Sequence, residues 1–160
     1  YDDAIKEGAE NLDRSMDEIV TIASLVEREA KVPEEFAMIA GVIYNRLNSS
    51  RFPYLEIDAS VLYGLGRTSG TLTAADLETD TPYNTYLHEG LPPGPICNPG
   101  YNALYAASHP ADHDYYFYVA MPDGSHLFAT TNSEHERNKE KAAEAFAEAA
   151  NSSGEEDTGE

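Results

Sequence analysis

The stretch Thr21-Ile22-Ala23-Ser24-Leu25-Val26-Glu27-Arg28-Glu29-Ala30 is the part of the sequence that decides the fold. If each residue advances by about 100° from Ile19, as in an α-helix, the apolar side chains cluster on one face. Val20 and Leu25 widen this face on either side. The pattern therefore predicts an amphipathic helix with a broad apolar side that packs against the rest of the protein.

Two carboxylates lie in the apolar half of this helix. Glu27 falls near about 80° from Ile19 and Glu29 near about 280°, and both angles border apolar neighbours. An apolar surrounding disfavours the ionised carboxylate, so the pKa rises and the group can stay protonated near neutrality, as a general acid requires. Periodicity does not separate the two residues. It also leaves open a second interpretation, in which both are solvated or paired with a cation such as Arg14, Arg28 or Arg46.

Further helices are predicted on both sides of this stretch. Ser15 and Glu18 have the spacing of a capping box, which predicts a helix from there to about Ala30. Pro33 suits the first position of a second helix, which we expect to end near Asn48. Short helices or turns are predicted over residues 58–65, 73–77 and 102–108.

The C-terminal third changes from helical to strand patterning and back. Residues 115–121 are rich in aromatic and β-branched side chains, and 122–124 carry the Pro-Asp-Gly signal of a turn. Residues 126–130 then return as the second strand of a hairpin. Ser133 with Glu136 predicts a second capping box, which opens a final helix to about Ala150.

These elements predict an α+β domain. We expect a helical part that carries the acidic pair to pack on a small antiparallel sheet with a C-terminal hairpin and a final helix. Residues 1–13 are acidic and weakly patterned, which indicates a lead-in from a longer protein. Residues 14–150 form the predicted domain, and 151–160 lack apolar side chains and are expected to be a disordered acidic tail.

Composition excludes several classes of function. The formal net charge of −19 argues against nucleic acids and anionic membranes as partners, because both require clustered Lys and Arg. The single Cys97 excludes an internal disulfide and a cysteine-based zinc cluster. No apolar run reaches the about 18 residues that a membrane span needs. The chain begins with Tyr1 rather than Met, so we expect any anchor to lie outside this sequence.

No motif indicates a metal or an organic cofactor. His109, Asp112 and His113 do not have a standard zinc spacing, and we expect a solvated loop there. A Gly-rich phosphate loop is absent, and Ser24, Ser60 and Cys97 lack the context of an activated nucleophile.

The Pro-rich run 90–100 and Asp58 each allow two interpretations. A stiff loop loses little entropy on binding, so the run suits the wall of a groove for an extended substrate, but a structural connection is equally compatible. Asp58 suits either a second carboxylate of the site or the cap of a helix that begins at Ala59, and its spacing favours the cap.

Several separated blocks follow one another in a characteristic order. They are ASLVERE (23–29), AGVIYNRL (40–47), DASVLYGL (58–65), YNTY (83–86), GLPPGPICNPG (90–100), YFYV (116–119), GSHLF (124–128) and EH (134–135). Over about residues 18–140 the chain thereby resembles the catalytic domain of the MltG/YceG-like endolytic murein transglycosylases. It departs from the family where Asp58-Ala59-Ser60 replaces the usual Asp-Pro-Thr and where Glu136 replaces an Asn.

The resemblance implies a bacterial enzyme of the cell wall, anchored in the cell membrane by a segment that precedes this sequence, with its catalytic domain on the extracytoplasmic side. The family cleaves MurNAc–GlcNAc bonds in peptidoglycan glycan strands without water, leaves 1,6-anhydroMurNAc ends and needs no cofactor. Its catalytic Glu corresponds to the first Glu of the block, Glu27, and Glu29 is the second candidate. Peptidoglycan synthases are the partners that such a role suggests.

A single Glu would serve as general acid and then as general base. Substrate-binding residues are expected among Asp58, Ser60, Tyr63, Asn84, Pro93 and Asn98, although packing and turn formation explain Tyr63 and Asn84 equally well. Three alternatives stay open: a hydrolase with Glu27 as acid and Asp58 as base, an inactive glycan-binding or scaffold module, and an interaction domain that uses its acidic faces.

Overall fold

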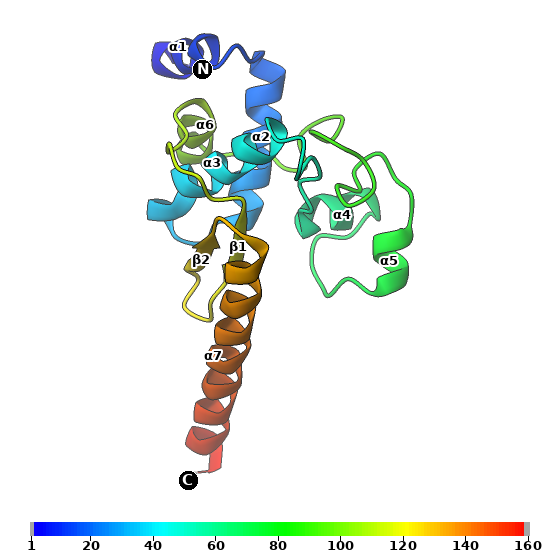
Figure 1. Ribbon diagram of the computed structural model, residues 1–160, viewed down its shortest axis with the longest axis vertical. Coiled ribbons are helices and arrows are strands. Elements are labelled where there is room, and N and C mark those ends of the chain that lie inside the picture. Colours follow the sequence, from blue (N-terminus) through cyan, green and yellow to red (C-terminus); the bar gives the residue numbers. More distant parts are fainter. Residues whose placement is uncertain (1, 159–160) are drawn as a thin grey trace.

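The computed structural model of the protein describes residues 2–158, with the side chains of 2–151. Its architecture is α+β, as predicted, with helices gathered around α2 and a two-stranded sheet followed by a long helix (Figure 1). The elements are α1 (Asp3–Asn11), α2 (Met16–Glu29), the 3₁₀ helix η1 (Pro33–Glu35), α3 (Phe36–Leu47), α4 (Asp58–Gly64), α5 (Ala74–Glu78), α6 (Tyr101–Ser108), β1 (Phe117–Ala120), β2 (His126–Ala129) and α7 (Asn132–Thr158).

Helix α2 lies at the centre of the core. Its predicted capping box is present: the Ser15 hydroxyl accepts a hydrogen bond from the Glu18 amide at 3.1 Å, and the Glu18 carboxylate accepts one from the Ser15 amide at 3.2 Å. Every residue from Thr21 to Val26 is buried. The helix packs against α1, α3, α4 and α6, so most of its circumference is covered by protein.

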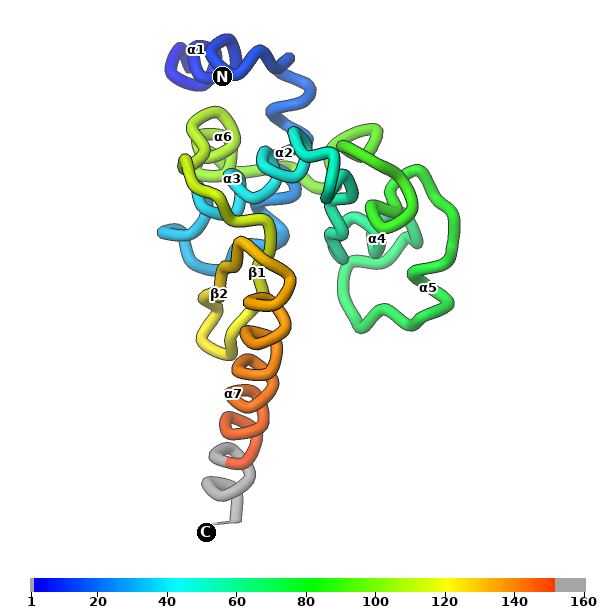
Figure 2. Tube along the Cα trace, in the orientation of Figure 1, coloured from blue at the N-terminus to red at the C-terminus, as the bar shows by residue number. Residues whose placement is uncertain are grey.

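Residues 1–13, which we expected to be a lead-in without pattern, contain α1 instead. The Asp2 carboxylate caps this helix by accepting a hydrogen bond from the Ile5 amide at 3.0 Å. Ile5 and Ala9, one turn apart, are buried and join the hydrophobic core. In Figures 1 and 2, α1 lies beside α6, which it contacts. Two buried positions among acidic neighbours were too weak a signal for periodicity to detect.

Residues 49–100 form a lobe beside α2 that contains only the short helices α4 and α5 (Figure 1). The Pro-rich run 90–100 has no regular structure, as its sequence predicted. The Ser24 hydroxyl connects this run to α2: it accepts a hydrogen bond from the Ile96 amide at 3.0 Å and donates one to the Thr21 carbonyl at 2.7 Å. The lobe is therefore fixed to the core through a fully buried polar contact.

The predicted hairpin is present with shorter strands. Phe117 pairs with Ala129 and Ala120 with His126 in an antiparallel register, and Gly124 adopts a positive φ of 91° in the turn between them. Glycine tolerates this left-handed conformation because it lacks a Cβ.

Helix α7 packs on both strands and then projects from the body of the protein (Figure 1). Its first turn is capped by Thr131, whose hydroxyl accepts a hydrogen bond from the Glu134 amide at 3.2 Å, so the predicted cap at Ser133 is wrong by two residues. The helix continues to Thr158, into the segment 151–160 that we expected to be disordered, because each added residue extends an existing ladder of hydrogen bonds. Residues 159–160 of that segment lie outside the described residues.

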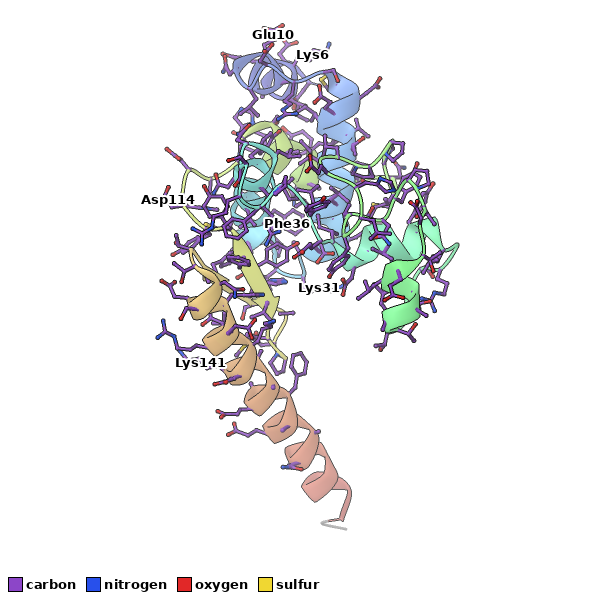
Figure 3. All side chains as sticks on the ribbon, turned by 45° about the vertical axis from the view of Figure 1, so that its right-hand side comes forward. Lys6, Glu10, Lys31, Phe36, Asp114 and Lys141 are labelled. Atoms are coloured by element: carbon purple, nitrogen blue, oxygen red, sulfur yellow. The ribbon has the colours of Figure 1, made fainter. Side chains whose placement is uncertain are left out.

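The distribution of charge follows the fold. Figure 3 labels Lys6 and Glu10 on α1 and Lys141 on α7, all of which are exposed, whereas Phe36 packs against the core. Within residues 2–158, no helix is both long and apolar enough to cross a membrane.

We predict that Ser24→Ala lowers the free energy of unfolding by about 1–3 kcal/mol, because the buried Ile96 amide then lacks an acceptor. Urea unfolding of the parent and the variant measures this difference. Ser50→Ala, at an exposed position, is the control and should leave stability unchanged. Equal stability of Ser24→Ala and the parent would show that the lobe is held by other contacts.

Candidate active site

Two cavities meet at Glu29, the last residue of α2. The first, about 310 Å³, lies between α2, α4 and the hairpin, and its walls include Arg46, Asp58, Tyr86, Tyr118, His126 and His135. The second, about 360 Å³, lies between the end of α2, α4 and the following loop, and its walls include Glu27, Lys31, Leu62 and Thr68. Lys31 is labelled in Figure 3. We call the two cavities together the Glu29 groove.

The carboxyl group of Glu29 is closely surrounded by protein atoms, while part of the residue stays open to the groove. Burial, and to a smaller extent the negative charge of Asp58, raise its pKa from 4.5 to about 7. The Ala59 amide, Lys31 and the Tyr118 hydroxyl favour the charged form but do not outweigh burial. Glu29 is therefore a carboxylic acid that is partly protonated at neutral pH, although the residues around it are mostly polar or charged rather than apolar as expected.

Asp58 faces the same cavity as Glu29. Its Oδ1 accepts a hydrogen bond of 2.6 Å from the Tyr86 hydroxyl, and this contact together with burial raises the pKa of Tyr86. Asp58 makes no cap: the residue before α4 is Ile57, which provides no side-chain hydrogen bond to the helix. The favoured interpretation of Asp58 as a helix cap was therefore wrong, because the side chain turns toward Tyr86 rather than toward the amides of its own helix.

Glu27 has a different environment from Glu29. Its Oε1 accepts a hydrogen bond of 2.8 Å from the Gly100 amide, at the start of α6, and it lines only the second cavity. The side chain thus connects α2 to the end of the Pro-rich run. The arginines considered as partners for Glu27 and Glu29 are engaged elsewhere among the described residues: Arg14 pairs with Glu18 at 2.7 Å, and Arg28 donates a hydrogen bond to the Thr68 carbonyl.

Arg46 forms part of the wall of the first cavity. Its Nε donates to the Tyr116 carbonyl and its Nη1 to the Tyr54 carbonyl, both at 2.6 Å, and Glu56 lies 3.7 Å away. Burial lowers its pKa from 12.5, but the group stays charged at neutral pH. This guanidinium therefore places a fixed positive charge and N–H donors at the cavity.

Two histidines complete this wall. The His126 ring and backbone amide are both held by the Glu35 carboxylate, at 2.9 and 3.0 Å. His135 stacks on Phe117 with 4.9 Å between ring centroids, and burial lowers its pKa. Its Nδ1 is buried without a hydrogen-bond partner in the described part of the chain.

The other predicted groove residues do not line the two cavities. Ser60 is buried and donates a hydrogen bond to the Tyr83 carbonyl at 2.7 Å, and Tyr63 packs edge-on against Tyr83. Asn84 is fully buried, donates to the carbonyls of Leu77 and Thr79, and accepts from the Tyr86 amide. The structural alternative for these three residues therefore fits better than substrate binding, because the polar atoms of Ser60 and Asn84 are used inside the lobe and the Tyr63 ring packs on Tyr83.

Pro93 and Asn98, the two candidates in the Pro-rich run, are exposed. They belong to the wall of neither cavity. Of the six residues expected to bind substrate, only Asp58 lies in the Glu29 groove. The Pro-rich run is a connection in this structure, held to α2 by the hydrogen bond between Ile96 and Ser24.

Sequence reasoning missed most of the first cavity. Tyr86, Tyr118 and His126 lie in blocks that carried the family resemblance, but they are separated from Glu29 in the sequence, and nothing in the local pattern placed them beside it. Within the described residues, no group of three or more His, Cys, Asp or Glu side chains is arranged to hold a metal ion.

The fold and the groove define an α+β domain in which one carboxylic acid, Glu29, has a pKa near neutrality. Comparison with known proteins identifies the family of this domain. The chain belongs to the YceG-like family, whose model matches residues 1–141. It is 42% identical over 127 residues to the endolytic murein transglycosylase of Bacillus subtilis (strain 168), a match that covers 79% of this chain and 35% of that protein.

Two further relatives agree with this assignment. The endolytic murein transglycosylase of Streptococcus pneumoniae (serotype 2, strain D39) is 35% identical over 130 residues, which cover 78% of this chain and 23% of that protein. A crystal structure of a yceG-like protein from Listeria monocytogenes superposes with a TM-score of 0.75 at 38% identity, over 82% of this chain and 43% of that one. The chain thus spans about a third or less of the length of the curated relatives.

We predict that the raised pKa of Glu29 makes the parent less stable, relative to Glu29→Gln, as the pH rises. The folded state holds the proton to about pH 7 and the unfolded chain releases it near 4.5, so the contribution of Glu29 is fully present below pH 4.5 and is lost through pH 7. We expect a relative loss of about 2 kcal/mol in the free energy of unfolding, measured by urea titrations at pH 4.5, 6 and 8. A pH-independent difference would contradict the raised pKa.

We predict that Asn84→Asp destabilises the fold by about 3 kcal/mol, because a carboxylate cannot donate to the Leu77 and Thr79 carbonyls. Urea unfolding at pH 7 is the measurement. Asn98→Asp, at an exposed position, is the matched control and should change stability little. If Asn84→Asp stays as stable as the control but loses glycan binding, Asn84 is a substrate contact after all.

Proposed function

We propose that this chain is the catalytic part of an endolytic peptidoglycan lytic transglycosylase, with Glu29 as its general acid and base. The observation that carries the proposal is the Glu29 carboxyl group, buried in a groove with its pKa raised to about 7. A general acid works best when its pKa lies near the operating pH. The family assignment supports the same activity, since the relatives from B. subtilis and S. pneumoniae bear that name.

In the proposed reaction, the Glu29 carboxyl group acts first in its protonated form and then as a carboxylate. Protonated Glu29 donates its proton to the glycosidic oxygen between MurNAc and GlcNAc, and the bond to C1 of MurNAc breaks. The positive charge that develops at C1 is stabilised by the negative ends of nearby dipoles or by the acetamido group of the sugar. The Glu29 carboxylate then takes the proton of the MurNAc 6-hydroxyl as that oxygen bonds to C1, which leaves a 1,6-anhydroMurNAc end. The 6-hydroxyl belongs to the same sugar, so its proximity favours it over water.

Asp58 supports this role of Glu29. An anionic neighbour disfavours ionisation of a carboxyl group, so Asp58 helps to keep Glu29 protonated before the first step. The Tyr86 hydroxyl holds Asp58 at 2.6 Å. Glu27 was the residue implied by the family resemblance, but its hydrogen bond to Gly100 and its position in the second cavity alone favour a structural or substrate-positioning role.

The groove extends to both sides of Glu29, because this residue lines two adjoining cavities. The two cavities would hold the sugars on either side of the scissile bond, which is compatible with the endolytic activity that the relatives are named for.

We extend the proposal to the setting of the activity. The complete protein would be anchored in the bacterial cell membrane by a segment outside this sequence, with the domain on the cell-wall side, where peptidoglycan synthases are its expected partners. The net charge of −19 argues against close contact with anionic lipid and is compatible with a domain held away from the bilayer.

Mass spectrometry of the products tests the activity. Purified, uncrosslinked glycan strands are incubated with the parent, Glu29→Gln and Glu27→Gln at pH 7. We expect anhydro-ended fragments from the parent, a loss of at least about a hundredfold in Glu29→Gln, and a smaller effect in Glu27→Gln. The two Gln variants are matched controls for each other, since each replaces one carboxyl group by an amide in the same turn of α2.

Other outcomes identify the alternatives. Hydrated ends would indicate a hydrolase that uses the Glu29–Asp58 pair as acid and base. A greater loss in Glu27→Gln, with Glu29→Gln active and both folded, would transfer the catalytic role to Glu27. Strand binding without cleavage by the parent would support a glycan-binding or scaffold module.

A further inference from the structure

His126 lines the Glu29 groove and is paired with Glu35 behind it, and the reaction above uses neither residue. Glu35 ends η1, and His126 begins β2, 91 positions later in the chain. One carboxylate oxygen accepts a hydrogen bond from the His126 amide at 3.0 Å, and the other contacts Nδ1 of the ring at 2.9 Å. Both side chains are shielded, with exposed fractions of 3% for His126 and 15% for Glu35.

This contact determines which ring nitrogen carries the proton. A carboxylate only accepts hydrogen bonds, so Nδ1 must be the donor. In the neutral ring the proton on Nδ1 leaves a lone pair on Nε2. At metal sites, a carboxylate behind one nitrogen fixes the orientation of a histidine whose other nitrogen binds the metal, and the same geometry orients the His126 ring here.

The second ring nitrogen of His126, Nε2, is available to bind a ligand. His126 lines the first cavity together with Glu29. Its Nε2 has no hydrogen-bond partner among the described residues, and it is not one of the polar atoms that are buried and unsatisfied there. The backbone contact with Glu35 would by itself hold the start of β2, so the strand does not require an imidazole at this position.

The surroundings of Nε2 restrict the ligand. The charged and titratable groups at the cavity come from several elements. They are Glu29 from α2, Arg46 from α3, Glu56 before α4, Asp58 at the start of α4, Tyr86 in the lobe, and Tyr116, Tyr118 and His135 on the C-terminal side. Arg46 provides donors, and the carboxyl groups provide acceptors with negative charge. With the tautomer fixed by Glu35, Nε2 of His126 adds an acceptor, which suits a hydroxyl or an amide N–H of a sugar.

We propose that His126, oriented by Glu35, binds the sugar in the first cavity by accepting a hydrogen bond at Nε2 from a hydroxyl or acetamido N–H group. The inference rests on the proposed function for the identity of the sugar. His126 is then a substrate-binding residue, and Glu35 is a positioning residue that acts through it.

Kinetics of three variants test this assignment. His126→Asn keeps a donor near the Nδ1 position for Glu35 but has no atom at the position of Nε2, and Glu35→Gln keeps the shape of the partner while allowing the other tautomer. We expect each to lower kcat/KM for uncrosslinked strands by about tenfold, mainly through a higher KM. His88→Asn, which breaks the exposed contact of His88 with Asp80, is the matched control and should behave like the parent. Unchanged kcat/KM in His126→Asn, or a loss no greater than its unfolded fraction, would overturn the assignment.

Nuclear magnetic resonance separates this inference from the proposed reaction. Histidine ring ¹⁵N shifts are recorded in Glu29→Gln, which cannot use the carboxylic acid, during titration with the same strands. We expect the free protein to show the Nδ1–H tautomer of His126, and binding to shift Nε2 while Nδ1 changes little. Such a shift would support the assignment even if the parent cleaves nothing. Bound strands without a shift at Nε2, a doubly protonated ring in the complex, or no binding of strands would each overturn it.

Discussion

The burial of α2 is the constraint on which the rest of the structure depends. Four helices cover it, and the residues from Thr21 to Val26 are buried. A helix enclosed in this way can present charged side chains only at its ends. Its first turn is satisfied by the Ser15–Glu18 capping box, and its last turn carries Glu27 and Glu29 to the boundary between the core and the lobe.

The lobe and the hairpin turn that boundary into a groove. Helix α4 brings Asp58 beside the last turn of α2, and β1 brings Tyr118, so Glu29 loses water on several sides at once. Arg46 does not neutralise this carboxyl group, because its N–H donors are directed to the carbonyls of Tyr54 and Tyr116. The groove therefore contains a protonatable acid beside an anion, with a cation whose hydrogen bonds go elsewhere. A carboxyl group that stays protonated near neutral pH is what acid catalysis requires.

Local signals in the sequence were sufficient where a feature depends on neighbouring residues. The Ser15–Glu18 cap, the helix after Pro33 and the turn at Gly124 each depend on contacts within a few positions, and each is present. The same approach was wrong at Asp58, which is directed to Tyr86, 28 positions away. It was also wrong at the start of α7, where Thr131 and Ser133 are both suitable caps and only the end of β2 selects one of them. The helix over Asp3–Asn11 was missed because its stability comes from packing on α6 rather than from its own composition.

The sequence by itself determined the α+β class, the central amphipathic helix and the presence of two carboxylates on its apolar side, since these follow from periodicity and turn chemistry. The blocks of residues also led to the YceG-like family, of which the chain is a member. Only the tertiary structure distinguished the two carboxylates, because positions near 80° and 280° on a helical wheel are equivalent until other elements pack against them. The packing of α4 and the hairpin buries Glu29, whereas α6 offers Glu27 a backbone amide. The chemistry available to each carboxylate was thus decided by residues distant in the sequence, through desolvation and hydrogen bonding that no local pattern encodes.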